Sequence, residues 1–69
     1  MLGLKPIKTL PIREKIAATL REAILSRKIA AGEVLTLEST AQELGVSITP
    51  VREAFQILAR DGLLELKQN

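Results

Sequence analysis

The stretch GVSITPVREA, residues 45–54, places two hydroxyl side chains and one arginine at the expected start of a helix. Ser47 and Thr49 can bind phosphate oxygens beside the free backbone N–H groups of a helix N-terminus. Arg52 can donate two hydrogen bonds to O6 and N7 of guanine, or it can instead form a solvent-facing pair with Gln56 or a contact with Glu53. The first of these possibilities predicts recognition of duplex DNA.

The composition argues against an enzyme. The 69 residues contain no cysteine and no histidine, which excludes disulfides, thiol nucleophiles, imidazole bases and zinc sites of the Cys/His kind. A domain of this size buries only about 60% of its unfolded surface and cannot enclose a deep catalytic pocket. The sequence also has no glycine-rich phosphate loop and no pairing of a nucleophile with a base. We therefore expect a binding module without a cofactor or a metal.

The basic residues are concentrated in the first part of the chain. Residues 1–28 contain seven Lys or Arg and two Glu, whereas residues 29–69 contain three basic and six acidic side chains. The net charge of +2 and the pI of 9.4 are too mild to identify a partner by themselves. The basic part is either a solvated helix face or a surface that faces phosphate groups. No apolar run approaches the roughly 18 residues of a membrane span and no secretory signal is apparent, so we expect a cytoplasmic protein.

Apolar periodicity predicts three helices that follow an N-terminal arm. The arm, residues 1–10, shows no sustained period, whereas isoleucine and leucine recur every four residues from Ile12 to Ile24. This pattern predicts a first helix from Pro11 to about Arg27, because proline loses nothing by lacking an N–H group in a first turn.

The second helix is expected to run from Leu37 to Leu44. Thr36 is a suitable N-cap, because its side-chain oxygen can accept an unpaired N–H group of the first turn. Gly45 follows at the position where a helix exit often requires the left-handed conformation, which glycine adopts without steric penalty.

The third helix begins at Ser47 or Thr49, and we favour Ser47 as its N-cap. Asp61 and Gly62 are expected to end it, and LLELKQN, residues 63–69, is typical of the first strand of a hairpin. Apolar side chains at spacings of three and four form one inward stripe on this helix. The predicted core unites this stripe with the first two helices and contains Leu20, Ile24, Leu44, Val51, Phe55 and Leu58.

Two short helices separated by residues 45–47 are typical of a helix-turn-helix, and a generic three-helix bundle is the alternative. With the apolar stripe turned inward, Ile48, Arg52 and Gln56 recur every four residues on the outer face of the third helix. A recognition helix presents such residues to base edges in the major groove. We therefore expect this outer face to contact DNA.

Two long segments resemble a known family. LREAILSRKIAAGEVLTLE followed by AQELGVSITPVREAFQILARDGLLEL resembles the DNA-binding domain of GntR-type bacterial transcriptional regulators, in the branch with a helical effector-binding domain. The resemblance covers residues 12–69. It implies a mainly α domain over residues 11–69, namely a three-helix winged helix-turn-helix with a short β-hairpin wing. By this alignment the chain stops inside the wing and lacks the effector domain.

The resemblance also implies a function and partners. Regulators of this family bind double-stranded operator DNA in a sequence-specific manner, form homodimers, and respond to a small-molecule effector at the C-terminal domain. The family contacts and the outer face of the third helix together give nine DNA-binding candidates: Thr36, Glu38, Ser47, Ile48, Thr49, Arg52, Gln56, Gln68 and Asn69.

Some of these candidates depart from the usual chemistry. Ile48 stands where the family has an arginine, so it either contacts a thymine methyl group or makes no base contact. Thr36 and Glu38 fall at the N-terminus of the second helix, which approaches the DNA backbone in relatives, although a carboxylate is a poor phosphate ligand. Gln68 and Asn69 fall toward the wing tip, which reaches the minor groove in the family.

Three other functions compete with DNA binding. A protein-interaction module with a winged-helix shape is the alternative that the acidic excess after residue 28 favours. Binding to RNA ranks lower, because RNA-binding surfaces usually stack bases on aromatic side chains and the only aromatic residue, Phe55, is assigned to the core. An enzyme ranks last for the reasons of composition given above.

Overall fold

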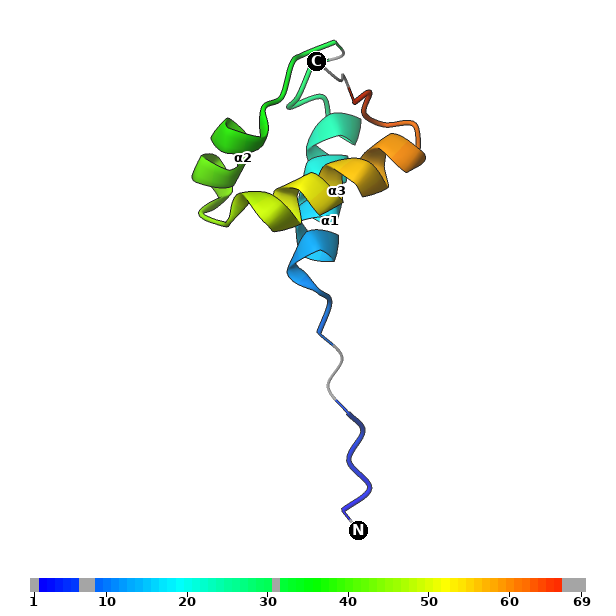
Figure 1. Ribbon diagram of the computed structural model, residues 1–69. Coiled ribbons are helices and arrows are strands. Elements are labelled where there is room, and N and C mark those ends of the chain that lie inside the picture. Colours follow the sequence, from blue (N-terminus) through cyan, green and yellow to red (C-terminus); the bar gives the residue numbers. More distant parts are fainter. Residues whose placement is uncertain (1, 7–8, 31, 67–69) are drawn as a thin grey trace.

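The computed structural model describes residues 2–6, 9–30 and 32–66 of the chain. Within these residues it contains three helices and no strand, in the order α1 (Ile12–Leu25), α2 (Leu37–Leu44) and α3 (Ile48–Arg60) (Figure 1). The prediction of a mainly helical, three-helix fold is confirmed. The predicted wing is not seen, because residues 63–66 form no strand and residues 67–69 lie outside the described residues.

The first helix is shorter than its apolar pattern predicts. Pro11 is the N-cap instead of the first helical residue, and α1 ends at Leu25, so the expected end near Arg27 is wrong by two residues. The chain reverses early because the N–H groups of Lys28 and Ile29 both donate to the carbonyl of Ala23, in the last turn of the helix. Apolar spacing continues to Ile29 and therefore hides this exit.

The two ends of α2 match the sequence expectation. The Thr36 hydroxyl accepts the backbone N–H of Ser39 at 3.1 Å, which confirms Thr36 as the N-cap. Gly45 has a φ of 69° and ends the helix in the left-handed conformation. The N–H of Val46 then donates to the carbonyl of Ala41 at 3.0 Å and closes the turn into the next helix.

The third helix begins at Ile48 with Ser47 as N-cap, the choice that the sequence favoured over Thr49. The Ser47 hydroxyl forms no capping hydrogen bond, although its extended backbone, with φ −73° and ψ 160°, is the one that N-caps adopt. Asp61 is the C-cap, which confirms the predicted end of the helix.

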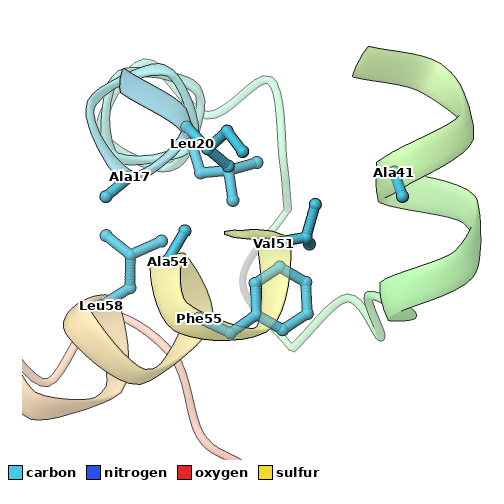
Figure 2. Close-up of a cluster of buried hydrophobic side chains, with 8 residues drawn as sticks. Ala17, Leu20, Ala41, Val51, Ala54, Phe55 and Leu58 are labelled. Atoms are coloured by element: carbon cyan, nitrogen blue, oxygen red, sulfur yellow. The ribbon is translucent and has the colours of Figure 1, made fainter. Parts of the chain in front are cut away.

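The core lies where α3 packs against α1 and α2 (Figure 2). Leu20, Val51, Phe55 and Leu58 are buried as predicted, and the small residues Ala17, Ala41 and Ala54 allow the helices to approach one another. Ile16 completes the buried apolar set. Ile24 and Leu44 were expected inside but are half-buried at its edge, because they lie in the last turns of α1 and α2.

The remaining described residues lie outside this core. Residues 2–6 and 9–11 form no helix or strand and leave the body from the start of α1 (Figure 1). The connection between α1 and α2 and the segment after α3 lie at the opposite end of α1. No helix of the described residues has the length and apolar character that a membrane span requires.

Candidate nucleic-acid interface

The outer face of α3 consists of three side chains that the core does not use. Val51, Ala54, Phe55 and Leu58 of the same helix are buried against the other two helices, so side chains on the opposite face of α3 point away from α1 and α2. Ile48, Arg52 and Gln56 are all exposed, as the helical spacing predicts. The structure therefore gathers the three candidates for base contacts on one helix face.

Ile48 is the unusual member of this face. Its side chain is 38% exposed, although isoleucine gains free energy from burial. It occupies the first position of α3, directly after the N-cap, and it does not belong to the core cluster that includes Val51. An apolar side chain in this place can contact the methyl group of thymine in the major groove.

The N-terminus of α3 offers hydrogen-bond donors for an anion. Ser47 and Thr49 are exposed, and the Ser47 hydroxyl is not occupied by capping. The first N–H groups of an α-helix have no partner within the helix and carry the positive end of its dipole. A phosphate group can therefore be bound by backbone N–H groups together with one or both hydroxyls.

The start of α2 is less suited to bind phosphate. The Thr36 hydroxyl accepts the Ser39 N–H and lies 2.7 Å from the Ser39 hydroxyl, so much of its hydrogen-bonding capacity is used locally. Glu38 is exposed in the first turn, where its carboxylate stabilises the helix dipole and repels a phosphate. Gln68 and Asn69, the two candidates in the wing, lie outside the described residues.

A groove joins these elements. Arg52, Phe55 and Gln56 line it from α3, and Leu37 lines it from the start of α2. The remaining lining residues come from the end of α1, from the connection that follows it and from residues 62–66. The outer face of α3 therefore borders a concave surface to which all described elements except the N-terminal arm contribute.

The charges leave Arg52 available for a ligand. Among the described residues, the ion pair within 4.0 Å joins Arg21 to Asp61, far along α3 from its N-terminus. In the same part of the chain no hydrogen bond or ion pair joins Arg52 to Glu53 or Gln56, the contacts that would occupy it locally. The guanidinium can therefore bind a partner in bidentate geometry.

Comparisons with known proteins identify the family of the chain. The model of the bacterial regulatory proteins of the gntR family matches residues 12–69. A regulator from Streptomyces ambofaciens, described as an uncharacterized HTH-type transcriptional regulator in an unstable DNA locus, is 39% identical over 54 residues, which are 78% of this chain and 23% of that protein.

Two gluconate operon transcriptional repressors are also similar over 54 residues. The protein from Bacillus licheniformis is 37% identical and the one from Bacillus subtilis 39% identical, and in both cases the match covers 78% of this chain and 22% of the relative. The chain thus spans less than a quarter of the length of these relatives, and no solved structure matches it significantly. The chain belongs to the gntR family of bacterial regulatory proteins, a membership that supports DNA-binding transcription regulation.

Proposed function

We propose that this chain binds double-stranded DNA sequence-specifically, with α3 in the major groove, as the DNA-binding domain of a ligand-responsive transcriptional regulator. The observation that carries the proposal is the exposed outer face of α3, on which Ile48, Arg52 and Gln56 lie at helical spacing while the opposite stripe is buried. Arg52 has the guanidinium needed to read a guanine, and Ile48 has the apolar surface needed to contact a thymine methyl group.

The hydroxyls at the start of α3 complete the proposed contact. Ser47 and Thr49 hold one phosphate at the helix N-terminus and so fix the register of the helix in the groove. Thr36 and Glu38, at the start of α2, approach the DNA backbone. Thr36 adds a weak contact with a phosphate there, and Glu38 adds no favourable contact. Gln68 and Asn69 are proposed to approach the minor groove.

Regulation is proposed by analogy with the family. Two of the similar proteins are named as gluconate operon repressors, which favours repression over activation for this chain. The effector is a small molecule that binds a separate C-terminal domain, and the full regulator acts as a homodimer on an operator with two half-sites. No cofactor is needed for the DNA contact.

Selection of bound sequences from a random duplex pool tests this function. The expected result is an enriched motif that contains a guanine opposite Arg52 and a thymine opposite Ile48. Retention of all sequences alike would contradict sequence-specific binding.

The second candidate is a protein-interaction module, which the exposed acids Glu38 and Glu43 of α2 and Glu53 of α3 favour. A titration with duplex DNA at two salt concentrations separates the two functions, because binding through phosphates weakens steeply as salt increases. Absence of salt-dependent binding to any duplex would favour the protein partner.

A further inference from the structure

Arg27 has an unusual backbone conformation. Its φ of 63° lies in the left-handed region, and it is the one non-glycine residue with a positive φ among the described residues. This conformation brings the Cβ atom of an L-residue close to the following carbonyl oxygen, so glycine or asparagine is usual at such a helix exit. The chain therefore holds an arginine at a position where the backbone alone favours glycine.

The hydrogen bonds at the end of α1 impose this conformation. The N–H of Arg27 donates to the carbonyl of Ile24 at 3.1 Å, and the N–H groups of Lys28 and Ile29 both donate to the carbonyl of Ala23, at 2.9 and 3.1 Å. Glycine would satisfy the same bonds with less strain. The turn therefore does not explain the arginine, and its side chain must be considered.

The side chain of Arg27 belongs to the groove beside the recognition helix. Arg27 lines this groove from the turn that follows α1, and Arg52 lines it from α3. Arg27 is exposed, and among the described residues it takes part in no ion pair within 4.0 Å. Two carboxylates line the same groove, of which Glu33 accepts the N–H of Ala30 at 3.1 Å and Glu65 is exposed.

We propose that Arg27 is a DNA-binding residue, which binds a phosphate group of the strand that borders the groove occupied by α3. The inference rests on the proposed function, because α3 must approach DNA for the guanidinium to meet a phosphate. An exposed guanidinium without a carboxylate partner is well suited to this contact, since it can form two parallel hydrogen bonds with phosphate oxygens. The contact positions the protein and carries no sequence information.

The assignment distinguishes Arg27 from the other basic residues in the first part of the chain. Arg13 and Lys15 lie in the first turn of α1, next to the N-terminal arm and outside the groove, so they remain on a solvated face. Arg27 follows the other end of the same helix and lines the groove beside α3. The strained backbone is then the structural cost of a binding residue, a relationship often found at functional sites.

The variant Arg27→Gly tests the inference, because its effects on stability and on binding have opposite signs. The melting temperature should rise by a few degrees as the left-handed strain is relieved. The affinity for a short duplex of mixed sequence should fall about tenfold at low salt. The slope of log K against log salt concentration should become less steep by about 0.9, the value for one lost phosphate contact.

Two further variants provide the controls. Arg13→Ala removes one charge outside the groove and should leave the salt slope unchanged, and Arg27→Lys keeps the charge and should lose less affinity than Arg27→Gly. Wild-type binding together with an unchanged slope in Arg27→Gly would overturn this inference alone. Equal losses in Arg13→Ala and Arg27→Gly would also overturn it, because net charge would then account for the effect. Failure of the wild-type chain to bind any duplex would instead overturn the proposed function.

Discussion

The Nη2 atom of Arg21 donates a hydrogen bond to Oδ2 of Asp61 at 2.7 Å and so joins the middle of α1 to the residue that caps α3. A carboxylate at a helix C-terminus meets the negative end of the dipole, so the guanidinium offsets an unfavourable charge there. The two side chains are 38% and 47% exposed, and water therefore screens their attraction.

We predict that Asp61→Asn lowers the free energy of unfolding by at most about 1 kcal/mol, because exposed ion pairs contribute little. The loss should shrink as salt is added. Denaturant unfolding at low and high salt measures both effects, with Arg21→Gln and the double variant completing a thermodynamic cycle. A loss well above about 1 kcal/mol that persists at high salt would contradict a screened ion pair as the source of the stabilisation.

The second prediction concerns the aromatic side chain of the core. Phe55 is 6% exposed and packs beside Val51 and Leu58, so Phe55→Ala should cost about 3 to 5 kcal/mol, enough to unfold a domain this small. Circular dichroism during thermal unfolding provides the measurement, with the exposed neighbour Gln56→Ala as the matched control. An unchanged melting temperature in Phe55→Ala would contradict the placement of this ring in the core.

Gly45 determines the turn between α2 and α3. Its φ is 69° and a Cβ atom there would meet nothing within 4 Å, so the only cost of Gly45→Ala is conformational, about 1 to 2 kcal/mol. Gly3→Ala is the matched control, because Gly3 has a φ of 70° in a segment without a helix and should lose nothing measurable. Equal melting temperatures of the two variants would refute the role of the left-handed turn.

Most of the helical architecture could be predicted from the sequence, and the errors have physical causes. The stripe of Val51, Ala54 and Leu58 predicts a buried face because its period is that of a helix, and all three side chains are buried. The end of α1 was placed too late, because apolar spacing does not record that Arg27 turns left-handed. The wing was predicted from the composition of residues 63–69, but composition does not record whether a strand finds a partner, and residues 63–66 form no strand.

The site was predictable only where it lies on a helix. Helical spacing places Ile48, Arg52 and Gln56 together, and their exposure confirms that the three residues share an outer face. Whether they contact bases remains a prediction. Arg27 was not singled out, because its position beside the groove depends on the chain reversal that follows α1.

Ile48 provides a prediction that distinguishes a base contact from a neutral position. Ile48→Arg should favour guanine over thymine at one base pair by about 1 to 3 kcal/mol, whereas the unchanged protein should prefer thymine there. Binding of both proteins to operators that differ at this pair measures the preference. If the unchanged protein shows no preference and the arginine variant gains none, Ile48 does not face the bases.

The most direct test of the proposed recognition compares Arg52→Ala with Thr49→Ala on the selected operator and on operators changed at single base pairs. Arg52 is proposed to read a base, so its loss should remove the preference at one pair, worth about 1 to 3 kcal/mol, and leave the other pairs unaffected. Thr49 is proposed to bind phosphate, so its loss should weaken binding to every operator by the same factor. A uniform loss of affinity in Arg52→Ala, with the preference at every base pair retained, would contradict the account.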